Sequence, residues 1–174
     1  MKKNILVSTG GSGGHIVPAE ILSDHLKEKF NVFISSDVRG MKYLNKKKDD
    51  YIVIDTPRLD FDLLILFKIF KVSYLIIKSY FFLKNNKIRK VFSTGGYMSL
   101  PVCVSAYLLG IDIYLLEPNI VLGRANKFFL KFCKIIFSYT KNLKNYPEKY
   151  KDKIQTISPL VRKAFYELKK LENK

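Results

Sequence analysis

The feature that most constrains the fold is a glycine-rich turn between an apolar run and a helical pattern. Residues 8–19 read STGGSGGHIVPA and hold four of the nine glycines of the chain. They directly follow the apolar run Ile5-Leu6-Val7 and precede apolar positions at helical spacing, as in the strand, turn and helix of an α/β protein. The amides of such a turn and the dipole of the helix behind it favour negative charge. The sequence therefore predicts an anion-binding turn near the start of the chain.

The rest of the chain repeats this alternation of strand and helix. Apolar runs of strand length occur at residues 5–7, 32–34, 51–54, 89–93, 111–116, 135–139 and 154–157. Helical patterns occur at 18–30, at 62–84, in a segment ending at Leu109, and at 123–132 and 160–171. Pro18 is expected in the first turn of its helix, where its missing amide costs nothing. This alternation predicts an α/β fold, a doubly wound parallel sheet with right-handed crossovers.

Three polar loops follow strands of the predicted sheet. They are the opening glycine turn, a second turn at Gly95-Gly96-Tyr97, and the loop Glu117-Pro118-Asn119. The carboxyl ends of parallel strands meet at one edge of a sheet, where doubly wound folds bind ligands. The three loops therefore form one candidate site. The opening turn lacks both the Gly-Lys-Ser/Thr of nucleotide hydrolases and the spaced glycines of the dinucleotide fingerprint.

Two side chains in these loops are able to carry acid-base chemistry. His15 stands at the expected start of a helix, and an imidazole there is able to take a proton from an attacking hydroxyl, although a capping or buried histidine is the alternative. Glu117 ends an apolar strand and is either an acid of the site or the partner of a nearby lysine. His25 lies on the same helix beside apolar positions and is expected to be structural.

A long apolar segment at residues 62–84 carries regularly placed lysines, which interrupt it too often for a membrane span. Lys68, Lys71 and Lys78 fall in one narrow stripe of a helical wheel and leave a broad apolar surface with Phe and Tyr side chains. Such a surface is typical of an interfacial helix. The segment is therefore predicted to pack on the sheet as a crossover helix, to contact a membrane, or to do both.

Composition limits the partners and the compartment. The 31 basic residues exceed the 15 acidic ones and give a formal charge of +16, which favours an anionic partner such as nucleic acid, a phosphorylated ligand or an acidic membrane. Cys103 and Cys133 lie in apolar patterns without metal-ligand spacing and are expected to be reduced core residues of a cytosolic protein. The N-terminal apolar run is too short for a signal peptide. The 174 residues fit one domain without an internal linker.

Four motifs, in order along nearly the whole chain, resemble those of the MurG family of glycosyltransferases. They are Gly10-Gly11-Ser12-Gly13-Gly14-His15, Gly95-Gly96-Tyr97-Met98-Ser99-Leu100-Pro101, Glu117-Pro118-Asn119 with Gly123 and Asn126-Lys127, and Val161-Arg162. The resemblance implies the amino-terminal, acceptor-side half of a GT-B enzyme, with a Rossmann-like domain at 1–158 and the start of a linker or closing helix at 159–174. It implies inverting transfer of N-acetylglucosamine (GlcNAc) from UDP-GlcNAc to the C4 hydroxyl of the muramoyl-pentapeptide on undecaprenyl diphosphate, without a metal or cofactor.

The resemblance also implies roles for individual residues. His15 matches the proposed base. Glu117 and Ser99 lie within the matching motifs and are expected to support the site. The residues that match donor contacts are Ser12, Gly13, Gly14, Asn119 and Arg162. The residues that match the turns under the acceptor diphosphate are Gly10, Gly11, Gly95, Gly96 and Tyr97. The residues that match the membrane-docking region are Phe67, Lys68, Lys71, Tyr74, Lys78 and Phe81.

The implied partners are UDP-GlcNAc, the lipid-linked acceptor, an anionic inner-membrane surface, and a UDP-binding carboxy-terminal domain or subunit expected outside these 174 residues. The implied location is peripheral, on the cytoplasmic face of the inner membrane, and no motif supports nucleic-acid binding.

Two departures from the family's motifs concern the donor site. Leu116-Glu117-Pro118-Asn119 stands where the family usually has His-Glu-Gln-Asn, and Ser158-Pro159-Leu160-Val161-Arg162 stands where it has Gly-Asn-Pro-Val-Arg. The alternative left open is a non-catalytic, polyprenyl-diphosphate-binding and membrane-docking subunit of a split glycosyltransferase.

Overall fold

The computed structural model describes residues 2–44, 50–57 and 63–162, and within these ranges each predicted strand has its counterpart. The strands are β1 (Lys3–Ser8), β2 (Phe30–Ser36), β3 (Asp50–Val53), β4 (Lys90–Ser93), β5 (Asp112–Glu117), β6 (Ile135–Ser138) and β7 (Ile154–Thr156). The α-helices are α1 (Gly13–Leu26), α2 (Ile65–Asn85), α3 (Ser99–Leu108) and α4 (Arg124–Phe129). Short 3-10 helices occur at η1 (Gly40–Lys42) and η2 (Glu148–Lys153).

The strands form one parallel sheet in the order β3-β2-β1-β4-β5-β6-β7. β1 lies inside it, with Ile5 opposite Val32 of β2 on one side and opposite Lys90 of β4 on the other. The chain winds outward through β2 and β3 in one direction and through β4 to β7 in the other, so the strand order reverses between β1 and β4. This arrangement confirms the predicted doubly wound, Rossmann-like sheet. The reversal point is where such sheets bind ligands.

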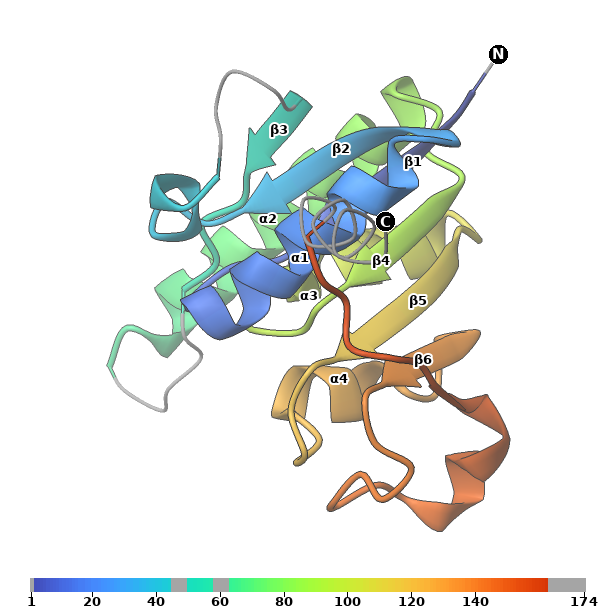
Figure 1. Ribbon diagram of the computed structural model, residues 1–174. Helices are drawn as coiled ribbons and strands as arrows, with labels where there is room; N and C mark the ends of the chain where they lie inside the picture. Colours follow the sequence, from blue (N-terminus) through green and yellow to red (C-terminus); the bar gives the residue numbers. More distant parts are fainter. Residues whose placement is uncertain (1, 45–49, 58–62, 163–174) are drawn as a thin grey trace.

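Helices cover both faces of the sheet (Figure 1). α1 lies in front of it in this view, where Ala19 packs with Ile5 and Val7 in a small core. α2 and α3 lie behind the sheet and belong to the main core, which includes Leu83 of α2 and Phe129 of α4. Because the central strands are buried on both faces, they read in the sequence as continuous apolar runs.

The first helix starts earlier than its apolar pattern predicted. α1 begins at Gly13 rather than at Pro18, so Pro18 lies inside the helix instead of in its first turn. Glycine has a low helix propensity, which concealed the first turn from a prediction based on apolar spacing. At the other end, Phe30 belongs to β2 instead of the helix. The closing helix predicted at 160–171 lies mostly outside the described residues, as does most of the linker expected at 159–174.

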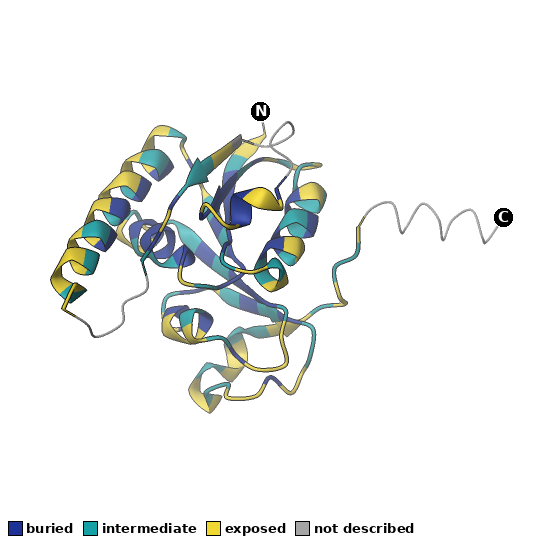
Figure 2. Cartoon of the chain, turned by 90° about the vertical axis from the view of Figure 1, so that its left-hand side faces the viewer, coloured by how far each residue is buried: buried dark blue, intermediate teal, exposed yellow. Residues whose placement is uncertain are grey.

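α2 is the predicted crossover helix, and only part of it packs on the sheet. Its buried residues, Val72, Leu75, Ser79 and Leu83, all follow its first two turns. The N-terminal turns stand clear of the rest of the molecule, and residues 63–70 are mostly exposed (Figure 2). Among the described helices, none combines the length and the apolar character that crossing a membrane requires.

Two of the lysines in the predicted stripe lie along the flank of α2 that faces the end of β3. Lys71 forms an ion pair with Asp55 at 3.6 Å, and Lys78 donates to the carbonyl of Val53 at 3.2 Å. The side of the helix that points away from the core carries apolar and aromatic residues three or four positions apart. This outward face of α2 consists of Phe67, Phe70, Tyr74, Ile77 and Phe81, which are between 55 and 74% exposed.

Candidate functional site

A pocket of about 540 Å³ opens at the reversal point of the sheet, and such a volume is typical of small-molecule sites. The N-terminus of α1, the second glycine turn and the loop between β5 and α4 form its walls. Its lining residues are His15, Gly95, Gly96, Tyr97, Leu100, Glu117, Gly123, Arg124, Ala125, Asn126, Phe128 and Phe129. The structure therefore brings together the three loops that the sequence placed at one edge of the sheet.

His15 is held by one ring nitrogen and lines the pocket with the rest of its ring. Its Nδ1 lies 2.7 Å from the carbonyl oxygen of Thr94, just after β4. A carbonyl only accepts, so the neutral imidazole carries its proton on Nδ1 and keeps a lone pair on Nε2. Thr94 is itself fixed, because its hydroxyl donates to Thr9 Oγ1 at 2.9 Å and its amide donates to the Ser8 carbonyl at 3.1 Å. This geometry leaves His15 able to accept a proton at Nε2.

The two glycine turns touch each other, and side chains at these positions would prevent the contact. Gly95 and Gly96 have φ of +87° and +82°, in the left-handed region that favours glycine. A Cβ on Gly96 would lie 3.3 Å from the carbonyl oxygen of Gly10, and a Cβ on Gly10 would lie 2.6 Å from Met98 Cγ. Ser99 donates its hydroxyl to the Gly96 carbonyl at 2.8 Å and so closes the second turn.

The N-terminus of α1 is open to a ligand. Its N-cap residue, Ser12, makes no side-chain hydrogen bond to the helix, and the first turn contains no acidic residue. The chain therefore leaves the dipole at this end of the helix uncompensated. Gly13 and Gly14, the first two residues of the helix, add no side chain between its backbone and a ligand. An anionic group is the chemical partner that such a helix start favours.

Gly11 uses its amide within the protein, because it donates to Oδ1 of Asp37 at 3.0 Å. The same carboxylate accepts the amide of Gly40 at 2.9 Å and Nε of Arg39 at 2.9 Å. Burial alone would raise the pKa of Asp37, but these hydrogen bonds and the charge of Arg39 outweigh it and hold the pKa below its ordinary value of 3.8. Asp37 is therefore ionised at neutral pH.

Glu117 organises the loop between β5 and α4, and no lysine of the described residues pairs with it. Its Oε1 accepts the backbone amide of Asn119 at 3.2 Å and the side-chain amide of Asn119 at 2.9 Å. Its Oε2 accepts the amide of Gly123 at 2.8 Å and Nδ2 of Asn126 at 3.0 Å. Asn126 in turn rests on the second glycine turn, since a Cβ on Gly95 would lie 3.1 Å from its Nδ2. One buried carboxylate therefore links the β5–α4 loop to the glycine turn.

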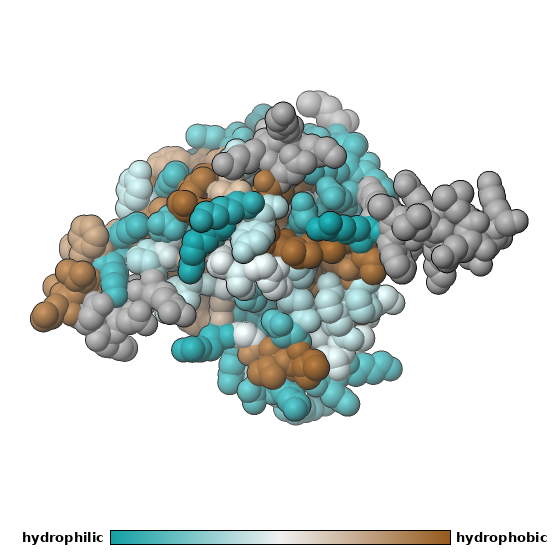
Figure 3. Space-filling view, turned by 60° about the vertical axis from the view of Figure 1, so that its left-hand side comes forward, coloured by the Kyte–Doolittle hydropathy of each residue, from teal (hydrophilic) through white to brown (hydrophobic). Residues whose placement is uncertain are grey.

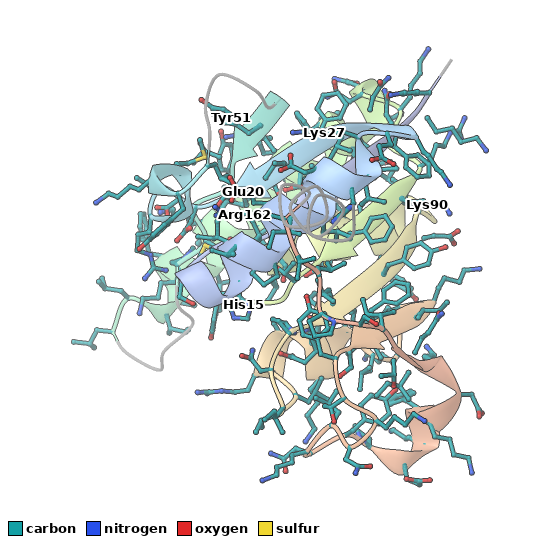
Figure 4. The ribbon with its side chains drawn as sticks, in the orientation of Figure 1. His15, Glu20, Lys27, Tyr51, Lys90 and Arg162 are labelled. Carbon is teal, nitrogen blue, oxygen red and sulfur yellow. The ribbon has the colours of Figure 1, made fainter. Side chains whose placement is uncertain are left out.

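The residues matched to donor contacts do not all lie together. Ser12, Gly13 and Gly14 are at the start of α1, and Asn119 is held by Glu117, which lines the pocket. Arg162 lies beside a later turn of α1, where its Nη2 is 3.5 Å from Oε2 of Glu20 (Figure 4). Figure 4 shows His15 near the N-terminal end of α1, whereas Glu20 and Arg162 lie near the middle of the helix. Arg162 does not line the pocket.

Asp37, Thr94 and the aromatic wall of the pocket are functional features that the sequence did not predict. Phe128 and Phe129 follow an ordinary amphipathic pattern, which gave no sign that one face of α4 lines a cavity. Asp37 was recognisable as a candidate from its position, because it directly follows β2 and so lies at the same edge of the sheet as the glycine turns. In the part of the chain that the structure describes, no three His, Cys, Asp or Glu side chains gather as metal ligands would.

Comparison with known protein families gives a match over most of the chain. The model of the Glycosyltransferase family 28 N-terminal domain matches residues 5–138. The chain is 50% identical to the UDP-N-acetylglucosamine--N-acetylmuramyl-(pentapeptide) pyrophosphoryl-undecaprenol N-acetylglucosamine transferase of Pelagibacter ubique (strain HTCC1062). The 167 aligned residues cover 95% of this chain and 47% of the relative. The transferase of the same name from Rickettsia prowazekii (strain Madrid E) is 36% identical, over 97% of this chain and 43% of the relative. The chain thus spans about half the length of these curated relatives.

Solved structures with the same fold are also about twice as long as this chain. The crystal structure of MurG from Acinetobacter baumannii superposes with a TM-score of 0.77 at 23% identity, over 95% of this chain and 48% of that one. UDP-GlcNAc 2-epimerase from Neisseria meningitidis, solved with UDP-GlcNAc, superposes with a TM-score of 0.64 at 16% identity, over 97% of this chain and 50% of that one. At these identities, the likeness establishes the shared Rossmann-like fold.

Proposed function

Since the chain belongs to the glycosyltransferase family 28 N-terminal domain family, we propose that it is the acceptor-side half of a GlcNAc transferase. The reaction moves GlcNAc from UDP-GlcNAc to the C4 hydroxyl of the muramoyl-pentapeptide on undecaprenyl diphosphate, with inversion at the anomeric carbon. The names of the relatives at 50 and 36% identity support this donor and this acceptor. The observation that carries the proposal is the Nε2 lone pair of His15 in a pocket walled by two glycine turns.

His15 is the proposed base. The C4 hydroxyl attacks the anomeric carbon of GlcNAc from the face opposite UDP, so that a C–O bond forms while the bond to the diphosphate oxygen breaks and its electron pair leaves with UDP. The hydroxyl proton passes to Nε2 of His15. The hydrogen bond from Nδ1 to Thr94 holds the ring and stabilises the imidazolium that results. A positioned base of this kind contributes about 10²–10⁴-fold to a reaction rate.

The glycine turns are the proposed seat of the acceptor diphosphate. The open start of α1 supplies a positive dipole, and the second turn, Gly95-Gly96-Tyr97, brings its backbone close to the same space. Arg124 adds a full positive charge to the pocket wall. Gly10 and Gly11 shape the first turn from behind, since the amide of Gly11 is already bound by Asp37.

The donor is proposed to lie against the start of α1 and Asn119, with its uridine held by a second, UDP-binding half. Ser12, Gly13 and Gly14 bring no bulky side chain to this surface. Arg162 would contact the donor only after leaving Glu20, with which it forms an exposed ion pair. Exposed pairs of this kind are weak, about 0–1 kcal/mol, so such a release is inexpensive.

The outward face of α2 is the proposed membrane-docking surface, which would place the protein peripherally on the cytoplasmic face of the inner membrane. Figure 3 shows the N-terminal end of α2 as a hydrophobic projection from a largely polar surface. α2 follows β3, so this end lies on the same edge of the sheet as the start of α1 (Figure 1). Lys68, Lys71 and Lys78 on the flank are within reach of anionic headgroups. Docking by this end would bring the pocket close to a lipid-linked acceptor.

A chimera tests the proposed function. In it, the present chain replaces the matching half of the Pelagibacter ubique transferase, to which it is 50% identical. The assay follows transfer of labelled GlcNAc from UDP-GlcNAc to the lipid-linked acceptor, with the present chain alone and the remaining half of the relative alone as controls. We expect product with the chimera and none with either half. A folded chimera that binds both substrates without turnover would contradict the proposal and favour the non-catalytic lipid-diphosphate-binding subunit.

A further inference from the structure

Asp37 stands where Rossmann folds that bind dinucleotides place an acid for the ribose, at the end of β2 and about 20 residues after the glycine turn. In those folds the carboxylate faces the ligand. Here the Asp37 side chain is 0% exposed, and its oxygens accept hydrogen bonds from Gly11, Gly40 and Arg39. An acid that would otherwise bind a ligand hydroxyl is therefore directed at the glycine turn of its own chain.

These contacts clamp the first glycine turn from two sides. Oδ1 of Asp37 takes the amide of Gly11 at 3.0 Å and lies 3.0 Å from the position of a Cβ on Gly10. Met98, from the second turn, closes on Gly10 from another direction, because the same Cβ would lie 2.6 Å from its Cγ. The first turn is thus packed between Asp37 and the second turn.

The same carboxylate supports the first turn of α1 through η1. Oδ1 accepts the amide of Gly40, the first residue of η1, at 2.9 Å. A Cβ on Gly40 would lie 3.0 Å from Cδ1 of Ile16, which is buried in α1 next to His15. Ser12 gives α1 no side-chain cap, and the bond from Gly11 to Asp37 fixes the backbone directly before the helix. The position of His15 therefore depends on Asp37 through both Gly11 and Gly40.

Arg39 reduces the electrostatic repulsion that a carboxylate beside an anion-binding turn would exert on a bound anion. Its Nε donates to Oδ2 of Asp37 at 2.9 Å, whereas its side chain is 69% exposed. The ion pair partly neutralises Asp37, so a phosphate at the start of α1 meets less repulsion from below.

We propose that Asp37 is a positioning residue, which fixes the first glycine turn and thereby the start of α1 and the ring of His15. The consequence for catalysis rests on the proposed function. The structural link from Asp37 to His15 is independent of the proposed function, and it is measurable in the 174-residue chain without a ligand.

The test uses ¹⁵N NMR of the His15 ring in the wild-type chain and in Asp37→Ala, Asp37→Asn and Ser105→Ala. The Asn variant keeps an oxygen for the amides of Gly11 and Gly40. Ser105→Ala is the control, because it removes hydrogen bonds within α3 and from α3 to α2, to the carbonyls of Pro101 and Ile76, and none to the first glycine turn. Thermal unfolding of each variant measures stability independently of the ring signals.

In the wild-type chain we expect the tautomer with the proton on Nδ1. Asp37→Ala should mix the tautomers and speed hydrogen exchange at His15 and Ile16, Asp37→Asn should do so less, and Ser105→Ala should leave both signals unchanged. Wild-type ring signals in Asp37→Ala, or equal changes in Ser105→Ala, would overturn the proposal. If Asp37→Ala does not fold, Asp37→Glu decides, because it keeps the charge but displaces the carboxylate: altered ring signals support the proposal, and wild-type signals overturn it.

A second measurement links the positioning role to the substrate. Geranyl diphosphate is titrated into each folded variant, and we expect it to bind about tenfold more weakly to Asp37→Ala than to the wild-type chain, since a misplaced site loses affinity steeply. Equal affinity would contradict any effect of Asp37 on the diphosphate seat. Failure of the wild-type chain itself to bind would instead count against the proposed acceptor site, while the His15 signals would still decide the positioning role.

Discussion

Single atoms decide what each polar residue around the pocket is able to do. Nδ1 of His15 is committed to the carbonyl of Thr94, which leaves Nε2 for chemistry. Both oxygens of Glu117 are committed to loop amides, so this residue supports the site without facing a substrate as a free acid. The amide of Gly11, a residue that the family resemblance placed under the acceptor diphosphate, is committed to Asp37. The partners of His15 and Gly11 lie 79 and 26 positions away, so residue spacing does not predict them. The partners of Glu117 lie within its own loop, but the direction of its carboxylate depends on how that loop folds.

Gly96→Ala should weaken diphosphate binding, an effect that a glycine substitution of similar cost to stability elsewhere in the chain should not have. The substitution places a Cβ at φ +82°, 3.3 Å from the Gly10 carbonyl, and so pushes the glycine turns apart. Gly110→Ala is the matched control, because its φ is also positive, at +66°, yet nothing lies within 4 Å of its Cβ. Both variants should lose roughly 1–2 kcal/mol of stability in urea unfolding. Only Gly96→Ala should raise the dissociation constant of geranyl diphosphate, and equal constants would contradict contact between the turns.

Asp37 should make the free energy of unfolding depend on pH in the acidic range. Its folded-state pKa lies below the ordinary 3.8, so folding favours the ionised form. The resulting stability is present above that ordinary value and is lost as the pH falls through the lower, folded-state pKa. The difference in unfolding free energy between the wild-type chain and Asp37→Asn should therefore shrink as the pH falls from about 6 to about 3. A difference that stays constant over this range would show that Asp37 titrates normally in the folded state.

The chemistry of the site was partly predictable at the residue scale. His15 was singled out because it stands beside glycines, which is a local signal. The tautomer of His15 depends on Thr94, 79 positions away, and the loop of Glu117 is closed by Gly123 and Asn126. Asp37 was predictable in principle from its place after β2, but its direction, inward rather than toward a ligand, is a tertiary property.

At the scale of elements, the loop between β5 and α4 behaves as one unit tied to a buried carboxylate. Glu117→Ala should therefore destabilise the chain by roughly 3 kcal/mol, because buried amides of the loop lose a charged acceptor. Glu117→Gln, which keeps one oxygen, should cost about half as much. Urea unfolding measures both. An effect of Glu117→Ala below about 0.5 kcal/mol, as for a surface substitution, would contradict this role.

α2 has a packed face and an outward face, and the outward face should bind membranes. Replacing both Phe70 and Tyr74 by Ser removes two side chains that are 74 and 63% exposed. Binding to vesicles with anionic lipid should fall by at least about tenfold, because burying each aromatic contributes roughly 1.5–3 kcal/mol. The control pair is Ile120→Ser with Val121→Ser, which are 64 and 47% exposed on the loop before α4. Vesicle co-sedimentation in which both pairs lose the same binding would contradict docking through α2.

The lysine stripe shows why an element's pattern does not fix its contacts. Helical spacing correctly predicted that Lys68, Lys71 and Lys78 share one side of α2. It did not show that this side flanks the end of β3, where Lys71 meets Asp55 and Lys78 meets Val53. The outward face of α2 was predictable as an apolar surface, whereas its exposure depended on how the helix packs beside the sheet.

At the scale of the whole molecule, the fold was largely predictable because each strand is a short apolar run and each crossover a helical pattern. Their alternation allows few topologies, and the doubly wound sheet is one of them. The gathering of three loops at one edge followed from parallel strands alone. The depth of the pocket did not, because it depends on how α4 packs beside α3 and places Phe128 and Phe129 in its wall.

The transfer rate of His15→Gln in the chimera with the Pelagibacter ubique relative tests the central claim most directly. Gln is able to keep a donor for the Thr94 carbonyl but has no basic nitrogen, so the fold and the acceptor affinity should persist while the rate falls by at least about 100-fold. His25→Gln, further along the same helix, is the matched control and should retain the rate of the unmodified chimera. A His15→Gln rate within a few-fold of that value would show that another group takes the proton.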